Sequence, residues 1–141
     1  MTEFRLDPRL EATSAAVGDL TLCHVRLSLD SRWPWLVLIP RRPGLVELTD
    51  VAGEDRTGLW GDLDRAAAGV RALAAVSGFE VGKLNVAALG NVVPQLHLHV
   101  IGRNAEDAAW PGPVWAVGEA RPYASAALDQ ATAAVRSALT D

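Results

Sequence analysis

A short stretch of alternating polar and apolar residues, 94–101, limits the fold of this chain more than any other feature. Alternate side chains of a β-strand point to opposite faces of the sheet, so the alternation predicts a half-buried strand over residues 92–101. The apolar face, expected in the core, consists of Leu96, Leu98 and Val100. The opposite face carries Gln95, His97 and His99. The Cα atoms of two residues with this spacing are expected about 6.6–6.8 Å apart.

Three further segments are predicted as strands. Residues 20–29 alternate between an apolar and a more polar face, and residues 35–39 form an apolar run that Pro40 ends. The short turn at residues 30–32 joins these two segments into an antiparallel hairpin. Residues 83–89 form the third segment, and Gly90 and Asn91 after it are typical of a turn.

Two helices are predicted as well. Thr49 or Asp50 is the candidate cap of the first, whose apolar residues recur every three to four positions until Ser77 and Gly78. Residues 124–139 are rich in alanine and predict the second helix. Residues 2–18 indicate a short helix or an extended lead-in, and residues 103–123 a loop. The order strand, strand, helix, strand, strand, helix predicts an α+β domain around an antiparallel sheet.

Size and charge exclude several classes of function. The 141 residues fit a single domain, 1–141, and the net charge of −4 argues against a long nucleic acid as main partner, because such binding usually needs a basic face. The one cysteine, Cys23, excludes an intramolecular disulfide. The apolar runs are too short to span a membrane, and the first residues do not resemble a signal peptide. We therefore expect a cytoplasmic protein without a membrane partner.

His97 and His99 are the residues best suited to carry chemistry. Neutral imidazole is a nucleophile near pH 7, and a histidine that attacks phosphorus divides one difficult displacement into two easier ones. A second imidazole can donate a hydrogen bond to the same phosphate and stabilise the charge that develops there. Gln95 can add an amide donor, but it cannot pass on a proton as a histidine can.

Three interpretations of this pair stay open from the residues alone. The histidines belong to a solvated strand face, or they are two ligands of a zinc site, or they form a nucleophile and its partner. A zinc site needs at least a third protein ligand. His24, Cys23 and the carboxylates do not lie at a suggestive spacing, so we expect no protein-bound metal.

The segment Gln95-Leu96-His97-Leu98-His99-Val100-Ile101, followed by Gly102-Arg103, resembles the signature of the histidine triad (HIT) family. In that family three histidines alternate with apolar residues on a strand. Two other segments are similar to the family as well. One is the strand and small-residue loop at residues 84–94, and the other is the apolar strand at residues 35–42, which ends in a proline and basic residues. The resemblance covers roughly residues 20–104, with a C-terminal loop and helix at 105–141. It implies a five-stranded antiparallel sheet with one long helix and a C-terminal helix, in a homodimer.

The resemblance also implies an activity. It points to a nucleotide-binding hydrolase or transferase that acts on the α-phosphate of dinucleoside polyphosphates or nucleoside phosphoramidates. His97 matches the nucleophile, which forms a covalent nucleotidyl-histidine, and His99 matches the histidine that contacts the phosphate. Gln95 stands where better-studied members have their first histidine, as in one bacterial branch of the family. Trp35 stands where a histidine is often found.

The remaining expectations concern substrate and cofactors. Asn91 and Gln95 are expected to position the phosphate or the leaving group, Asp30 to hold the ribose hydroxyls, and Asn85 to orient the motif strand. No cofactor is required, although a divalent cation can accompany a polyphosphate substrate. Two other functions stay open: a nucleotide-binding or scaffold protein with weak or no catalysis, because Gln95 replaces a histidine, and a metal hydrolase.

Overall fold

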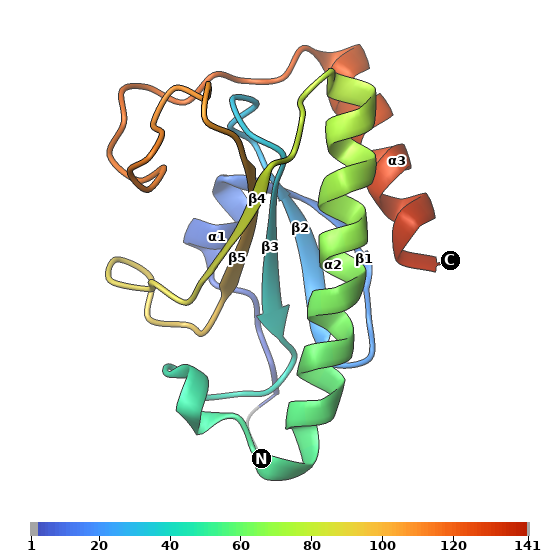
Figure 1. Cartoon of the computed structure of the whole chain (residues 1–141). Helices are drawn as coiled ribbons and strands as arrows, with labels where there is room; N and C mark the ends of the chain where they lie inside the picture. Colours follow the sequence, from blue (N-terminus) through green and yellow to red (C-terminus); the bar gives the residue numbers. More distant parts are fainter. Residues whose placement is uncertain (1–2, 141) are drawn as a thin grey trace.

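The structure, a computed structural model that describes residues 3–140, is built on a five-stranded antiparallel sheet (Figure 1). The strands are β1 (Ser14–Asp19), β2 (Cys23–Ser28), β3 (Trp35–Pro40), β4 (Lys83–Ala87) and β5 (Leu98–Arg103), in the spatial order β1-β2-β3-β5-β4. The helices are α1 (Pro8–Ala12), α2 (Arg56–Ser77) and α3 (Ser125–Thr140), and the 3-10 turns η1 (Leu48–Asp50) and η2 (Gly53–Asp55) precede α2. This architecture confirms the predicted α+β fold with one long helix and a C-terminal helix. Among residues 3–140, no helix is long and apolar enough to cross a membrane.

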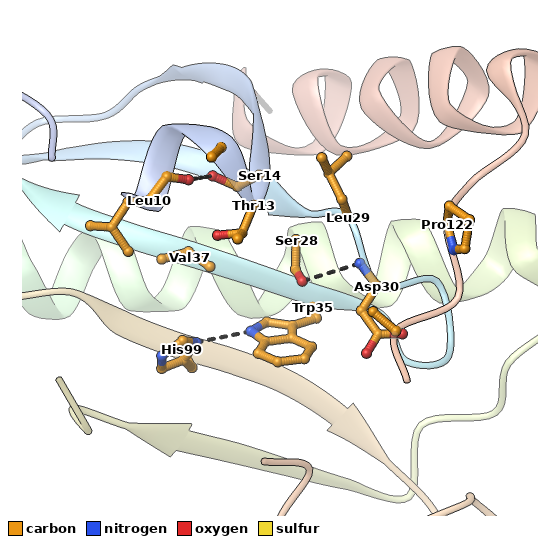
Figure 2. Close-up of a pocket in the computed structure, with 12 residues that line it drawn as sticks. Leu10, Thr13, Ser14, Ser28, Leu29, Asp30, Trp35, Val37, His99 and Pro122 are labelled. Atoms are coloured by element: carbon orange, nitrogen blue, oxygen red, sulfur yellow. Dashed lines mark hydrogen bonds between the residues drawn. The ribbon is translucent and has the colours of Figure 1, made fainter. Parts of the chain in front are cut away.

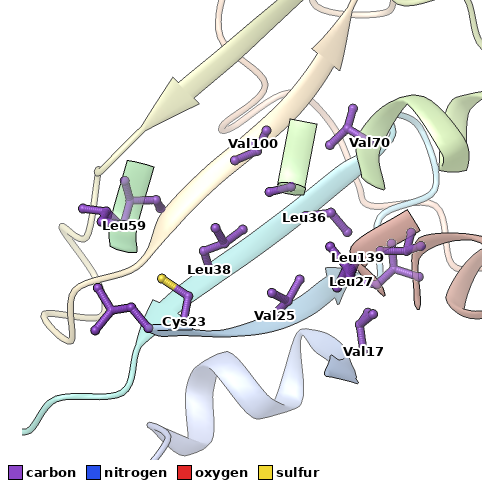
Figure 3. Close-up of a cluster of buried hydrophobic side chains, with 14 of the residues drawn as sticks. Val17, Cys23, Val25, Leu27, Leu36, Leu38, Leu59, Val70, Val100 and Leu139 are labelled. Atoms are coloured by element: carbon purple, nitrogen blue, oxygen red, sulfur yellow. The ribbon is translucent and has the colours of Figure 1, made fainter. Parts of the chain in front are cut away.

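The main core lies between the sheet and the two helices α2 and α3, which pack side by side on one face (Figure 1). Every second residue of a strand faces the same way, so the apolar positions of β2, β3 and β5 form one continuous surface. Val70 of α2 and Leu139 of α3 pack onto that surface (Figure 3). Leu96, Leu98 and Val100 all lie in this core, as the alternation predicted.

The opposite face of the sheet is covered by the N-terminal segment and by the loop between β5 and α3. One small cluster packs Leu10 of α1 against Val37 and Ile39 of β3. Another packs Ile101 of β5 against Val114 of the C-terminal loop. The candidate site lies between these clusters, on the face of the sheet that points away from α2 and α3.

The last strand is shorter than predicted, because β5 begins at Leu98 and not at residue 92. Pro94 has no backbone N–H to give to a ladder. The N–H of Leu96 donates instead to the carbonyl of Leu45, at 2.9 Å. The segment that carries Gln95 and His97 is therefore an irregular approach to the strand.

Two other boundaries differ from the sequence prediction. The long helix starts at Arg56 and not at residue 49 or 50, because the Asp50 carboxylate bonds to the N–H of Glu47, at 2.8 Å, and closes the separate turn η1. The end of α2 was predicted correctly: Gly78 adopts the left-handed conformation, with φ of 72°. The fifth strand, β1, falls where a helix or an extended lead-in was expected, and a register shift between Ala16 and Gly18 interrupts its pairing with β2.

Candidate active site

His97 and His99 lie next to each other on the open face of the sheet. His99 is in β5, opposite Val37 of β3, and His97 immediately precedes the strand. Their ring centroids are 4.9 Å apart, and the ring planes meet at 75°. The spacing of the motif therefore brings the two imidazoles together on one side of the chain, although only one of them is within the ladder.

The hydrogen bond made by Nδ1 of His97 fixes which nitrogen carries the proton in the neutral ring. Nδ1 lies 2.7 Å from the backbone carbonyl oxygen of Gln95. A carbonyl oxygen accepts and does not donate, so Nδ1 carries the proton of this bond. In the neutral ring, Nε2 is then left with its lone pair, which is the form that a nucleophile needs.

His97 is 6% exposed and lines a small cavity of about 70 Å³. Asn91, which was expected to contact the phosphate or leaving group, lines the same cavity. Gly90 beside it has a φ of 58°, and a Cβ there would come within 3.2 Å of the Val93 carbonyl oxygen and 4.0 Å of Cε1 of His97. A glycine is thus favoured at this turn by its backbone conformation and by the close approach of the Val93 carbonyl.

His99 is held by an indole. Nε1 of Trp35 donates to Nδ1 of His99 at 3.0 Å (Figure 2). The ring of Trp115 contacts the same imidazole, with centroids 4.6 Å apart. Burial, and secondarily the neighbouring His97, lower the pKa of His99 from 6.5 to about 3. His99 is therefore neutral at physiological pH.

A cavity of about 450 Å³ adjoins His99. Its walls come from the α1–β1 segment, the end of β2, the start of β3 and the C-terminal loop (Figure 2). They include Ser14, Ser28, Val37 and Pro122. A mostly apolar cavity with a few polar groups, of this volume, is the usual form of a small-molecule site.

Asp30 lines this cavity, where a ribose-binding residue was expected, but its carboxylate already has partners. Arg32 bonds to it through the guanidinium, at 2.8 Å for the shortest contact, and the N–H of Arg121 donates to it at 3.2 Å. Burial raises the pKa of Asp30, but the hydrogen bonds from Arg32 and the backbone outweigh it and lower the pKa overall. Asp30 thus joins the β2–β3 turn to the C-terminal loop at the rim of the cavity.

The side chain of Gln95 is not turned toward the histidine pair, which corrects the expectation that it shares their face. Its Oε1 accepts from the N–H of Asp7 at 2.8 Å, and its Nε2 donates to the carbonyl of Arg5 at 2.7 Å. Both ends of the amide are thus used to hold the N-terminal segment. Gln95 reaches the site only through its backbone carbonyl, which accepts from His97.

The side chain of Asn85 bonds to Arg103 and to neither histidine. Its Oδ1 accepts from Arg103 at 2.8 Å, and Arg103 forms a buried ion pair with Asp107, also at 2.8 Å. Burial raises the pKa of Asp107, but the bonds from Arg103 and nearby backbone amides lower it well below its usual value. Asn85 therefore ties β4 to the end of β5.

Sequence reasoning missed the residues of the N-terminal segment that lie beside the site. Arg9 donates to the Val92 carbonyl at 3.1 Å and to the Asp7 carboxylate at 2.9 Å. Arg9, and to a smaller extent His97, lower the pKa of Asp7. Nothing in the local pattern of residues 5–9 indicates this position, because the contacts join residues more than 80 positions apart.

The zinc interpretation finds no support in the arrangement of side chains. Within residues 3–140, histidine, cysteine, aspartate and glutamate side chains form no group of three or more that is placed to hold a metal ion. The hydrogen-bond partners of Nδ1 in His97 and His99 are a backbone carbonyl and an indole, neither of which is a usual zinc ligand.

The sequence matches a family model, and the fold matches solved structures. A family model of the HIT domain matches residues 9–106. The structure is similar to that of a histidine triad protein from Bradyrhizobium japonicum, with 38% identity, a TM-score of 0.87 and coverage of 98% of this chain and 99% of the other. A histidine triad protein from Sinorhizobium meliloti has 40% identity and a TM-score of 0.86, with coverage of 96% and 97%. One from Marinobacter aquaeolei has 38% identity and a TM-score of 0.86, with coverage of 99% and 98%. No curated protein matches the sequence.

Proposed function

The chain belongs to the HIT family, whose members are generally nucleotide-binding hydrolases and transferases, and we propose that it transfers a nucleotidyl group to His97 and then to water. The substrates we propose are dinucleoside polyphosphates or nucleoside phosphoramidates. The observation that supports this proposal best is the bond from Nδ1 of His97 to the Gln95 carbonyl, which leaves Nε2 with its lone pair. His99, 4.9 Å away between ring centroids, supplies a hydrogen bond to the same phosphate.

The proposed reaction has two displacements at phosphorus. In the first, the lone pair on Nε2 of His97 forms a P–N bond while the bond from phosphorus to the leaving group breaks. The leaving group departs with that electron pair and takes a proton from water. In the second, a water oxygen forms a new P–O bond, the P–N bond breaks and its electron pair returns to His97. The proton that this water releases combines with the hydroxide left by the first step. The products are a nucleoside monophosphate and the neutral histidine.

The cavity of about 450 Å³ beside His99 is the proposed nucleoside site. Its apolar walls suit a base or sugar, and His99 at its edge is the proposed hydrogen-bond donor to the α-phosphate. Asn91, in the small cavity of His97, is the proposed contact for the phosphate or the leaving group. Asp30 is the proposed contact for the ribose hydroxyls. Its carboxylate oxygens would accept from the ribose through the lone pairs that do not bind Arg32.

One observation favours a second candidate function, a nucleotide-binding protein with weak or no catalysis. The Gln95 side chain is bound to the N-terminal segment, and an amide at this motif position cannot donate a proton to a leaving group as a histidine can. If this second function is correct, the wild-type protein binds nucleotides but hydrolyses neither dinucleoside polyphosphates nor nucleoside phosphoramidates.

We also propose that the protein is a cytoplasmic homodimer of the bacterial branch with glutamine at the first motif position. The support for a dimer is an apolar surface at the edge of the sheet formed by β4. Leu48, Trp60 and Val86 are all exposed there and line a hollow of about 330 Å³. An edge strand with exposed apolar side chains is a natural pairing surface for a second copy.

The test is a panel of nucleotidyl substrates offered to the wild type and to His97→Ala. The panel includes a dinucleoside polyphosphate and a nucleoside phosphoramidate, each with and without a chelator. We expect wild-type turnover that survives chelation on the phosphoramidate, and a loss of at least about 10³-fold in His97→Ala with nucleotide affinity retained. Wild-type rates in His97→Ala would refute the nucleophile, and loss of phosphoramidate turnover on chelation would favour a metal hydrolase.

A further inference from the structure

The partner of His99 differs in kind from the partner of His97. Nδ1 of His97 faces a carbonyl oxygen, which only accepts, whereas Nδ1 of His99 faces the indole N–H of Trp35, which only donates. The Trp35 bond, 3.0 Å long, therefore forms only when Nδ1 of His99 carries no proton. A neutral imidazole with an unprotonated Nδ1 has its proton on Nε2.

We propose that Trp35 is a positioning residue that holds His99 as the neutral tautomer with its proton on Nε2. His99 then serves the reaction as a hydrogen-bond donor to phosphate, and it is neither a general base nor a second nucleophile. This inference rests on the proposed function of His97 and extends it to a division of work between the two rings.

The packing around Trp35 keeps its N–H in place. Trp35 lies on β3 opposite Ile101, and its ring makes edge contacts with Trp33, at 6.5 Å between centroids, and with Trp115, at 5.7 Å. The indole also meets the His99 ring edge to face, at 5.6 Å. Because three aromatic rings surround the Trp35 indole, the direction of its N–H is set by the fold and does not depend on a substrate.

The result is a pair of adjacent imidazoles with opposite polarity. Nε2 of His97 presents a lone pair and Nε2 of His99 presents an N–H, with ring centroids 4.9 Å apart. A phosphate that reaches both Nε2 atoms meets a nucleophile at one ring and a donor to its oxygens at the other. The pKa of His99, lowered to about 3 by burial and by His97, agrees with a ring that stays uncharged.

The first experiment reads the tautomer directly, without substrate. The ring nitrogens of ¹⁵N-histidine-labelled full-length protein are observed by NMR at pH 7, and His99→Gln assigns the His99 signals. In the wild type we expect an unprotonated Nδ1 and a protonated Nε2 for His99. Trp35→Phe keeps an aromatic ring but removes the N–H, so the His99 signals should shift toward a mixture of the two tautomers.

Trp115→Phe is the matched control, because Trp115 also packs its ring on His99 and the wild-type tautomer should persist in this variant. A wild-type His99 that is protonated on Nδ1 would overturn the proposal, as would a Trp35→Phe spectrum unchanged from the wild type. If Trp35→Phe fails to fold, the wild-type spectrum alone still decides whether Nδ1 of His99 is unprotonated.

The second experiment measures turnover of a nucleoside phosphoramidate. If about half to nine-tenths of the His99 population takes the wrong tautomer, kcat of Trp35→Phe falls by a factor of about two to ten with KM little changed. Removal of the donor altogether in His99→Ala should lower kcat by about 10²–10³. Wild-type kcat in Trp35→Phe would refute the role in the reaction. A wild type with the expected tautomer but no turnover would refute the proposed function while the tautomer assignment stands.

Discussion

In each neutral histidine of the site, a single neighbouring atom decides which ring nitrogen carries the proton. The Gln95 carbonyl and the Trp35 indole have fixed hydrogen-bonding roles, and together they give two chemically identical side chains different properties. Neither partner is recognisable from the alternation of the motif. The carbonyl belongs to a residue whose side chain faces elsewhere, and the indole comes from another strand, 64 positions away.

The lowered pKa of His99 predicts a specific dependence of stability on pH. The folded pKa of about 3 lies below the ordinary value of 6.5, so between these values the unfolded chain binds a proton that the folded chain does not. Stability contributed by neutral His99 is therefore complete above pH 6.5 and declines as the pH falls toward 3. The decline is up to about 1.4 kcal/mol per pH unit.

Urea unfolding of the wild type and His99→Gln between pH 7 and pH 4 measures this effect. The glutamine introduced in this variant cannot titrate, and its carbonyl oxygen can still accept the Trp35 N–H. We expect the wild type to lose stability relative to the variant on acidification, while contributions of the other titrating groups cancel in the difference. Parallel curves for the two proteins would contradict a depressed pKa at His99.

At the scale of elements, Gln95 acts as a clamp on the N-terminal segment. Its side-chain amide bonds to the backbone of this segment: it accepts from the N–H of Asp7 and donates to the carbonyl of Arg5. Gln95→Ala should therefore increase the hydrogen-exchange rate of the Asp7 amide by about 5-fold to 10-fold, as expected for the loss of about 1 kcal/mol per bond. Gln130→Ala, at an exposed position of α3, is the control that should leave this amide unchanged. Unaltered protection of Asp7 in Gln95→Ala would show that the clamp does not hold the segment.

A buried carboxylate joins the long helix to the sheet. Oδ2 of Asp62, on α2, accepts from the N–H of Leu22 at 2.8 Å and from the N–H of Cys23 at 2.7 Å. Asp62→Leu leaves two buried N–H groups without this partner, and we expect a loss of about 2–4 kcal/mol in the free energy of unfolding. Asp62→Asn should lose less, because one amide oxygen can accept both bonds. Equal losses in the two variants, measured by urea unfolding, would show that the hydrogen bonds are not the cause.

The strands and helices with a clear pattern were predictable, and the exceptions have physical causes. The hairpin β2–β3, the end of α2 and the helix α3 follow from alternation, capping and alanine content. The strand β1 was not predicted, because its small residues lack a strong alternation and a register shift interrupts it. In the site, the relation of His97 to His99 was predictable from spacing. The side-chain directions of Gln95 and Asn85 were not, since long-range hydrogen bonds determine them.

At the scale of the whole molecule, the apolar surface at the β4 edge continues to the cavity of His97. Val46 and Leu89 are exposed, and both line that cavity together with His97. In a homodimer paired along this edge, the second copy would close the surroundings of the nucleophile and reduce its contact with water. Dimer formation would therefore lower the exposure of His97 to water.

Trp60→Lys tests the dimer surface. Trp60 is 70% exposed and lines the hollow at this surface, so a charge there should prevent close packing of a second copy. We expect sedimentation to show a dimer for the wild type and a monomer for the variant, at least over micromolar concentrations. The control is Val76→Lys, another exposed apolar position on α2, which should remain dimeric. A dimer that persists in Trp60→Lys would place the interface elsewhere.

The most direct test of the account is the mass of the protein during turnover. The wild type is mixed with a nucleoside phosphoramidate, denatured within the first turnover at neutral pH, and analysed by mass spectrometry with peptide mapping. We predict an added mass equal to one nucleoside monophosphate less one water, located on His97 and missing in His97→Ala. Turnover by the wild type without any such adduct, or an adduct on His99, would contradict the assignment of His97 as the nucleophile.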